Sequence, residues 1–236
     1  MSKHSLTNNE IPIMHVLKLM HYIKEGRSVP VNGFKTSNTV ELINQTLVFD
    51  ANECCEIHIG NFKPSLTYVE EEMDWYLSQS LDVSKIGKTA KIWAQIADEN
   101  AKINSNYGYL MFSAQNGSQF NNVVKELQAG PKDTRKAVAY YTNPYMHYLG
   151  GNDHICTMYV SYLFRDDKLN AVVSMRSNDI RYGLIGADLL WQQFMLKKIA
   201  GKTAREVGNI YWHAASLHLY DRHFNDLDKL FGGSND

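Results

Sequence analysis

Apolar residues near the start of the chain recur with the spacing of an amphipathic helix. The positions in the i, i+3, i+4, i+7 pattern are Ile13, Val16, Leu17 and Met20. This spacing places the four side chains on one helix face, and Gly26 is a plausible helix end because glycine is common there. The pattern predicts a helix that covers part of a hydrophobic core.

A second helix has the clearest boundaries in the sequence. Its apolar face is formed by Phe120, Val123, Val124 and Leu127. Ser118 is a residue type that caps helix starts, and Gly130 followed by Pro131 ends the pattern. Further helices are predicted at about 67–80, 90–100 and 188–200.

Runs of β-branched and aromatic residues predict strands in the second half of the chain. These runs are KAVAYYT (136–142), CTMYVSYLF (156–164), LNAVVSMR (169–176) and GNIYWHAASLHLY (208–220). The segment FRDDKLN between the second and third runs is typical of a hairpin turn, so part of the sheet is expected to be antiparallel. The predicted fold class is α/β, in the sense of α+β, with a mixed β-sheet faced by helices.

The length and composition indicate one globular unit. The chain has 236 residues, of which 44% are hydrophobic, and this is enough for one large core. Because no repeat, low-complexity tract or long linker separates two cores, we expect a single domain over residues 1–236. No apolar run reaches the roughly 18 residues of a membrane helix, and the first residues lack the order of a signal peptide. We therefore expect a cytoplasmic protein that does not associate with membranes.

Charge and cysteine content narrow the kind of ligand. A net charge of -1 gives no general attraction for nucleic acid, so we expect no direct nucleic acid binding and a small ligand held by a few basic residues. Three cysteines are an odd number, and the adjacent Cys54 and Cys55 have neither zinc-ligand nor CxxC spacing. The sequence predicts free thiols and no metal site.

Cys156 lies in an apolar run and allows two interpretations. A free cysteine is often a small buried hydrophobic residue. Twenty residues further on, however, MRSND places Arg176, Ser177 and Asp179 at a strand end. An arginine beside a thiol lowers the cysteine pKa below its usual value of about 8.5, and the thiolate is the nucleophile. Arg176 and Ser177 could equally bind a phosphate or form an ion-paired surface turn.

Glu72 falls on the apolar face of the helix predicted at 67–80. That face is marked by Val69, Met73 and Tyr76. A carboxylate on a buried face must be paired, hydrogen-bonded or shifted in pKa, and such groups often act as acids or bases. The alternative is a glutamate at the edge of the apolar stripe that reaches solvent.

Three more polar residues have a functional and a structural interpretation. Asp188 precedes a predicted helix and would ordinarily be an N-cap. His218 and Tyr220 alternate with leucines, so they share one strand face. Two neighbouring polar side chains there could hydrogen-bond a sugar or simply cover the sheet.

Six sequence blocks carry a family resemblance, which spans roughly residues 67–224. They are EEMDWY, KIWAQIADENAKINSNYG, DTRKAVAYYTNP, ICTMYVSYLFRDDKLNAVVSMRSND, DLLWQQFML and WHAASLHLYDRHF. In these blocks the chain resembles the thymidylate synthase family, and within it most closely the deoxycytidylate hydroxymethylases of T-even-type bacteriophages. The resemblance implies a thymidylate synthase-like fold and a homodimer formed through the sheet. If the source is viral, the expected location is the host cell cytoplasm.

The resemblance also implies roles for the residues that react with the base. Cys156 corresponds to the nucleophile that adds to C6 of the pyrimidine, and Glu72 to the glutamate that orders water and shuttles protons. Asp188 stands where thymidylate synthases place an asparagine that pairs with uracil. A carboxylate there would accept from the 4-amino group of cytosine and pair with a protonated N3.

The remaining matches concern the nucleotide phosphate, the sugar and the folate. Arg176 and Ser177 match phosphate ligands, and Lys35 lies where the family has a phosphate-facing loop. Arg135 and Lys136 match the basic pair that reaches the phosphate from the other subunit. The resemblance places His218 and Tyr220 on the sugar 3'-hydroxyl, and Trp93 and Asp179 beside the folate.

The chemistry explains why a thiol is needed. C5 of a pyrimidine is a poor nucleophile, and thiolate addition at C6 makes it an enamine-like carbon that can attack a one-carbon unit. The resemblance implies 5,10-methylenetetrahydrofolate as the cosubstrate that supplies this unit. Hydride transfer to the resulting exocyclic methylene gives a methyl group, whereas water gives a hydroxymethyl group.

The departures from the thymidylate synthase pattern bear on the product. Thr157 and Ser161 replace a histidine and a glutamine of that family, and one extra residue lies between Gly183 and Asp188. The sequence ends at FGGSND without the apolar tail that closes a methylating site against water. We expect conversion of dCMP, methylenetetrahydrofolate and water to 5-hydroxymethyl-dCMP. The alternatives are a dUMP or dCMP C5-methylase and an inactive nucleotide-binding member.

Overall fold

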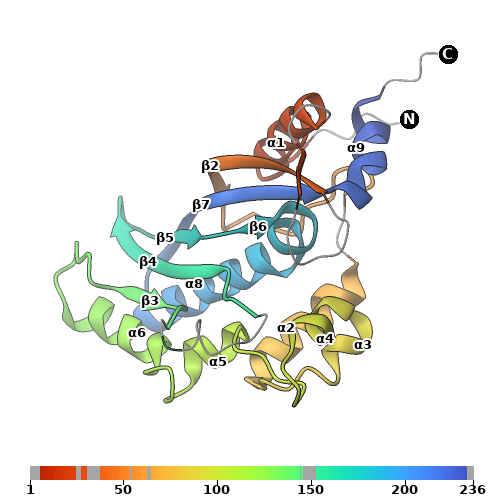
Figure 1. Cartoon of the computed structure of the whole chain (residues 1–236). Helices are drawn as coiled ribbons and strands as arrows, with labels where there is room; N and C mark the ends of the chain where they lie inside the picture. Colours follow the sequence, from red (N-terminus) through yellow and green to blue (C-terminus); the bar gives the residue numbers. More distant parts are fainter. Residues whose placement is uncertain are drawn as a thin grey trace.

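In the described part of the chain, seven strands form one mixed β-sheet (Figure 1). The computed structural model describes residues 6–24, 28–30, 38–53, 55–62, 65–143, 145 and 153–232. The strands are β1 (Ser28–Pro30), β2 (Asn38–Asp50), β3 (Val138–Tyr140), β4 (Thr157–Arg165), β5 (Lys168–Met175), β6 (Asn178–Asp179) and β7 (Glu206–Tyr220). Their order is β1-β2-β7-β5-β4-β3, and the short β6 also pairs with β7. The predicted mixed sheet is confirmed.

The turn between β4 and β5 is the predicted hairpin. The two strands are antiparallel, with Arg165 opposite Lys168. The two turn residues, Asp166 and Asp167, both have positive φ angles, of 50° and 59°. Aspartate tolerates this conformation better than most residues, and two consecutive positive φ angles match the twist of a tight hairpin.

β2 is one of the two longest strands and was not predicted from the sequence. β2 pairs antiparallel with β7 along most of its length. Its buried side alternates correctly through Val40 and Leu42, but the next buried residues are Leu47 and Phe49, which are out of phase with the first pair. The phase changes around Asn44, whose φ angle is 57°. A strand with such an irregularity has no continuous alternating signal.

The described residues form ten helical segments. They are α1 (Glu10–Ile23), α2 (Leu66–Ser78), α3 (Ile86–Thr89), α4 (Lys91–Ile96), α5 (Tyr107–Phe112), α6 (Gln119–Ala129), the π-helix η1 (Ile180–Asp188), α8 (Leu189–Thr203), the 3-10 helix η2 (Asp221–His223) and α9 (Phe224–Phe231). Five of these ten correspond to predicted helices, namely α1, α2, α4, α6 and α8. The segment predicted as one helix at 90–100 contains only α4, which ends at Ile96. Ser118 precedes α6 with a φ of 48° and makes no side-chain capping bond, so the predicted cap is wrong.

The main core lies between the sheet and α8. Trp191 and Met195 of α8 are fully buried, as is Trp212 on β7. The Trp191 indole donates to the Tyr141 hydroxyl at 3.0 Å and packs edge-on against Tyr76 of α2. Figure 1 shows α8 running along one face of the sheet, with α2 to α6 gathered below it. This packing fixes α2 and the start of α8 relative to the strand ends.

The opposite face of the sheet remains partly exposed. The exposed apolar or aromatic side chains on it include Ile43, Val48, Tyr159 and Tyr211. Ser161 lies on this face as well, since it alternates with the buried Val160 and Tyr162. The Ser161 side chain, which differs from the family pattern, therefore points away from the helices that cover the other face of the sheet.

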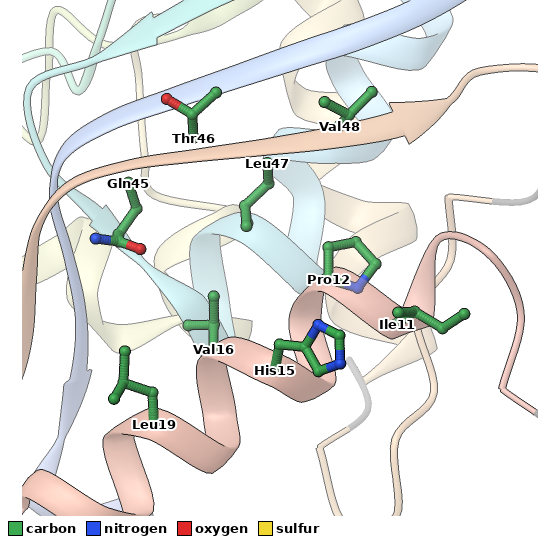
Figure 2. Close-up of a pocket in the computed structure, with 9 residues that line it drawn as sticks. All are labelled: Ile11, Pro12, His15, Val16, Leu19, Gln45, Thr46, Leu47 and Val48. Carbon is green, nitrogen blue, oxygen red and sulfur yellow. The ribbon is translucent and has the colours of Figure 1, made fainter.

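A cavity of about 440 Å³ opens between α1 and β2 (Figure 2). Val16, Pro12 and His15 of α1 face Leu47 and Gln45 of β2 across it. None of the predicted site residues lines this cavity. Among the described residues, no helix is both long enough and apolar enough to span a lipid bilayer.

Candidate active site

Strand pairing brings Cys156 and Arg176 together. Thr157 and Met175 are register partners at the ends of β4 and β5, so the residues just beyond them are adjacent. The Arg176 backbone N–H donates to the Cys156 carbonyl at 2.9 Å. The Arg176 guanidinium binds the backbone carbonyls of His154 and Ile155, and its Nη2 lies 3.6 Å from the Cys156 Sγ. The predicted neighbourhood of thiol and guanidinium is confirmed.

The Cys156 pKa is raised in the folded enzyme, whereas the sequence suggested that a neighbouring arginine would lower it. Burial raises the Cys156 pKa to about 11, although the Arg176 charge acts in the lowering direction. Desolvation disfavours the thiolate more than one guanidinium, occupied by backbone carbonyls, favours it. Without a ligand the thiol is therefore protonated at neutral pH.

Glu72 lies on the buried face of α2, as predicted. Its side chain is 3% exposed, and Oε1 accepts a hydrogen bond from the Tyr76 hydroxyl at 2.5 Å. Oε2 has no hydrogen bond of ordinary geometry within the described residues, although the Tyr68 hydroxyl acts to lower the carboxyl pKa. Burial outweighs both hydroxyls and raises the Glu72 pKa to about 8. A carboxyl with this pKa can hold or release a proton near neutral pH.

Asp188 is a buried carboxyl at the junction of η1 and α8. It makes no side-chain capping bond to α8, so the interpretation as an N-cap is wrong. Instead its Oδ2 accepts from the Asn178 Nδ2 at 2.8 Å. Burial raises the Asp188 pKa to about 7, while hydrogen bonding from Asn178 and Tyr107 acts to lower it.

The extra residue before Asp188 has a structural explanation. Residues Ile180–Asp188 form a π-helical segment that is interrupted by a kink at Gly186, where the backbone angles are not helical. A π-helical turn holds more residues than an α-helical turn and commonly accommodates one additional residue. The turn brings Asp188 back against Asn178, and Gly183 lets the backbone pass close to this pair.

A hydroxyl pair connects the strand of Cys156 with Asp188. The Thr157 Oγ1 donates to the Tyr107 hydroxyl at 2.9 Å, with Met175 Sδ at 3.1 Å as a second acceptor. Thr157 is fully buried and Tyr107 nearly so. With the Thr157 proton directed at its oxygen, the Tyr107 hydroxyl can donate to Asp188.

The polar pair at the end of β7 lies as predicted. The rings of His218 and Tyr220 are 5.4 Å apart in an edge-on arrangement on one strand face. Asp179 on β6 is the register partner of His218. Its Oδ1 accepts from the backbone N–H groups of Arg181 and Tyr182, so Asp179 caps η1 while its Oδ2 lies 3.9 Å from Arg222.

Trp93 is half-buried on α4 and packs against α2. Its ring centroid lies 5.0 Å from that of Trp75. The indole Nε1 is buried without a hydrogen-bond partner among the described residues. Buried indole N–H groups normally find an acceptor, so this donor is a candidate contact for a ligand.

The remaining predicted residues are placed differently. Ser177 is half-buried beside Arg176. Arg135 and Lys136 are exposed before β3, whose Val138 pairs with Ser161. Ser161 is five residues along β4 from Cys156, roughly 16 Å at the usual strand rise, and the basic pair lies further still. The structure does not bring them to this chain's own Cys156, and Lys35 lies outside the described residues.

Sequence reasoning missed several groups that complete the arrangement. Tyr76 is four residues after Glu72 on the same helix face, so the helical period could have paired them. Tyr107 and Asn178 lie inside the quoted blocks, but neither has a distinctive spacing. Together the site holds one thiol, one guanidinium and two buried carboxyls that can exchange protons near neutral pH. This set suits covalent addition followed by acid–base chemistry.

Comparisons with known proteins identify the family to which the chain belongs. The family model for thymidylate synthase matches residues 16–232. The deoxycytidylate 5-hydroxymethyltransferase of Enterobacteria phage T4 is 42% identical over 173 residues, which cover 68% of this chain and 70% of that protein. The deoxyuridylate hydroxymethyltransferase of Bacillus phage SP01 is 29% identical over 67% of this chain and 45% of its own length.

A solved structure confirms the predicted fold class. The thermostable thymidylate synthase A from Bacillus subtilis superposes with a TM-score of 0.73 at 21% identity, covering 95% of this chain and 84% of its own. The family match spans most of the sequence, and a named enzyme is 42% identical over 68% of the chain. The chain is therefore an enzyme that belongs to the thymidylate synthase family.

Proposed function

We propose that this enzyme converts dCMP, 5,10-methylenetetrahydrofolate and water to 5-hydroxymethyl-dCMP and tetrahydrofolate. The observation that carries the proposal is the buried carboxyl of Asp188, which shares the site with Cys156 and Arg176. The name and 42% identity of the T4 relative support the same substrate and reaction.

Asp188 suits a cytosine ring. The Watson–Crick edge of neutral cytosine offers an acceptor at N3 and a donor at the 4-amino group. Because the Asp188 pKa is about 7, a large share of the carboxyl is protonated at neutral pH and can donate to N3 while accepting from the amino group. The proton that N3 needs can therefore come from Asp188, and the sequence-based expectation of a protonated N3 describes the same shared proton.

Cys156 is the proposed nucleophile. Addition of its sulfur to C6 moves electron density from the C5–C6 bond into the ring, and the Asp188 proton at N3 stabilises this charge. Arg176 stabilises the thiolate form of Cys156 and, with Ser177, is the proposed phosphate ligand. Because the thiol pKa is about 11 in the free enzyme, deprotonation is expected to accompany attack rather than precede it.

Glu72 is the proposed proton-transfer group for the second half of the reaction. Attack of C5 on the one-carbon unit of the cosubstrate, followed by loss of the C5 proton and departure of tetrahydrofolate, leaves an exocyclic methylene on C5 of the bound ring. Glu72 in its ionised form can deprotonate a water that adds to this carbon, and a pKa of about 8 keeps the base strong enough to do so. Release of the Cys156 sulfur then restores the aromatic ring.

Trp93 and Asp179 are the proposed folate-side residues. The unpartnered Nε1 of Trp93 offers a donor beside the aromatic surface of Trp75. Flat aromatic surfaces suit a pterin or aminobenzoyl ring. His218 and Tyr220 are proposed to bind the sugar 3'-hydroxyl from the adjacent strand end.

We also propose that the enzyme acts as a homodimer joined through the open face of the sheet. Exposed Val48, Tyr159 and Tyr211 on that face would be covered in such a dimer. Large exposed apolar patches commonly mark interfaces. The distance of Arg135 and Lys136 from their own Cys156 fits a role in the partner's site.

The mass of the nucleotide product tests the reaction. Enzyme, dCMP and methylenetetrahydrofolate should yield a nucleotide heavier by CH2O, with no absorbance increase from dihydrofolate. Gain of only CH2 with stoichiometric dihydrofolate would identify a methylase instead. Failure to release tritium from C5 of dCMP, dUMP and CMP alike would identify a nucleotide-binding protein without turnover.

A further inference from the structure

Asn178 stands next to the proposed base-recognition carboxyl but belongs to no part of the mechanism above. It follows Ser177 on β6 and is 2% exposed. Its Nδ2 donates to Asp188 Oδ2 at 2.8 Å, whereas its Oδ1 is buried without a partner among the described residues. We infer that Asn178 is a positioning residue that fixes which oxygen of Asp188 can carry a proton, and so lets the site distinguish cytosine from uracil.

The hydrogen-bond pattern of a carboxylic acid depends on which oxygen carries the proton. A neutral carboxyl offers one donor and one acceptor, and the proton can lie on either oxygen. Cytosine offers an acceptor at N3 and a donor at position 4, whereas uracil offers a donor at N3 and an acceptor at position 4. A carboxyl whose proton is free to change oxygens therefore matches both bases.

The amide of Asn178 removes this freedom. Because Nδ2 donates to Oδ2, a proton placed on Oδ2 would meet a donor and lose that hydrogen bond. The proton of the neutral acid is therefore held on Oδ1, and Oδ2 stays an acceptor. The donor and the acceptor then stand in one fixed order, which fits only one of the two bases.

The backbone holds the pair in place. An added Cβ on Gly183 would lie 2.6 Å from Asn178 Nδ2 and 2.7 Å from Asp188 Oδ2, so the π-helix passes directly against this hydrogen bond. The absence of a side chain at Gly183 leaves room for the Asn178–Asp188 hydrogen bond, and that hydrogen bond opposes rotation of the carboxyl, which would exchange its two oxygens.

The unpartnered oxygen argues against a purely structural role. An amide that leaves one polar end unpaired in a buried place gains little for folding from its single hydrogen bond. A small apolar residue would serve stability about as well. We therefore expect Asn178→Ala to fold and to lose discrimination.

The direction of the preference rests on the proposed function. If the substrate is dCMP, Oδ2 accepts from the 4-amino group and the Oδ1 proton is donated to N3. The role of Asn178 in discrimination does not depend on turnover, because it concerns the binding of the base. Its test can therefore fail or succeed separately from the hydroxymethylation assay.

The experiment is calorimetric titration of dCMP and dUMP, without folate, into wild type, Asn178→Ala, Asp188→Ala and the double variant. Asn178→Ala should reduce the ratio of the two dissociation constants at least about tenfold. In the Asp188→Ala background, where Asn178 has no carboxyl to orient, the same substitution should leave the ratio unchanged within about twofold. Asn178→Ser serves as the second variant if Asn178→Ala does not fold, as judged by thermal unfolding.

Two results would overturn the inference. Equal weakening of both nucleotides by Asn178→Ala would mean that the residue only supports the fold. A tenfold change in the ratio that persists in the Asp188→Ala background would mean that Asn178 acts on the base without Asp188.

Discussion

Glu72 and Asp188 are both buried carboxyls, and their neighbours suggest different tasks. Two tyrosine hydroxyls surround Glu72, and its pKa is about 8. An amide and the Tyr107 hydroxyl restrain Asp188, whose pKa is about 7. A group held in one orientation suits recognition, whereas a group with a buried oxygen that lacks an ordinary hydrogen bond suits proton transfer to a bound water. This contrast underlies the roles proposed for them.

At the residue scale, the first prediction concerns the thiol. Cys156→Ala should bind dCMP but lose turnover by at least about a thousandfold, because no other group described at the site can form the bond to C6. Isothermal titration and C5 tritium release measure the two properties separately. Cys55→Ala is the matched control, since Cys55 is a buried cysteine in the core away from Arg176. Wild-type turnover by Cys156→Ala would exclude the covalent mechanism.

The second prediction at this scale concerns base choice. Asp188→Asn replaces a carboxyl that can pass a proton to N3 of cytosine with an amide that can only hydrogen-bond there, so dCMP loses its advantage over dUMP. A mismatched buried polar group costs about 1 to 3 kcal/mol, so the ratio of kcat/KM for dUMP over dCMP should rise at least roughly tenfold. Tritium release from both nucleotides measures the ratio. An unchanged ratio would remove Asp188 from base recognition.

At the scale of single elements, regular patterns were predictable and irregular ones were not. α2 and the β4–β5 hairpin were correctly predicted because apolar periodicity and turn residues specify them locally. β2 was missed because its phase changes around Asn44, and η1 because a π-helix has no simple sequence period. Ser118 is a residue type that commonly caps helices, but its φ angle is positive and its side chain makes no capping bond to α6.

In the candidate site too, features specified by the local sequence were predictable and features that depend on tertiary structure were not. Cys156, Arg176 and the buried position of Glu72 could be found from residue type and spacing. The partnership of Asn178 with Asp188 could not, because it depends on how far the π-helix turns before α8 begins. The sequence suggested that Arg176 would lower the Cys156 pKa. In the structure burial raises this pKa instead, and burial depends on tertiary packing.

A glycine substitution tests how η1 positions the site. Gly183→Ala would place a methyl group under 3 Å from both Asn178 and Asp188, so the pair must separate. We expect kcat/KM for dCMP to fall at least about tenfold. The thermal unfolding midpoint should change little. Gly201→Ala is the matched control, because this glycine in α8 has open space around its Cβ position and should be neutral or stabilising by up to about 1 kcal/mol. Equal activity of the two variants would contradict the proposed positioning.

At the scale of the whole molecule, the buried carboxyls should make stability depend on pH. The Glu72 pKa rises from 4.5 to about 8 on folding, so between these values the folded state holds a proton that the unfolded chain has released. Stability should therefore fall as pH rises through this window, by on the order of 4 kcal/mol for Glu72, and Asp188 acts in the same direction.

Glu72→Gln should remove most of the pH dependence of stability that Glu72 contributes. Urea unfolding near pH 5 and near pH 9 should show a smaller loss of stability for this variant than for wild type. Glu70→Gln, an exposed position on the same helix, should behave like wild type. A wild-type pH dependence in Glu72→Gln would show that the Glu72 pKa is not raised in the folded enzyme.

The last prediction concerns the proposed sharing of sites between two copies of the chain. Arg135 and Lys136 are exposed and lie well beyond Ser161 from their own Cys156, so within one subunit they cannot reach a nucleotide bound there. A twofold axis through the open sheet face would let each subunit supply this pair to the other. Arg135→Ala and Cys156→Ala should each lose most or all activity alone.

Mixing the two variants after reversible dissociation should restore activity. A mixed dimer has one site in which an intact Cys156 meets an intact Arg135 from its partner, and a second site that lacks both. Random reassociation makes half of the dimers mixed, so recovery should approach about a quarter of wild-type turnover. Native mass spectrometry measures the mixed fraction, and each variant taken through the procedure alone is the control. Mixed dimers without recovered activity would show that each subunit completes its own site, and a wild-type monomer by light scattering would remove the proposed interface altogether.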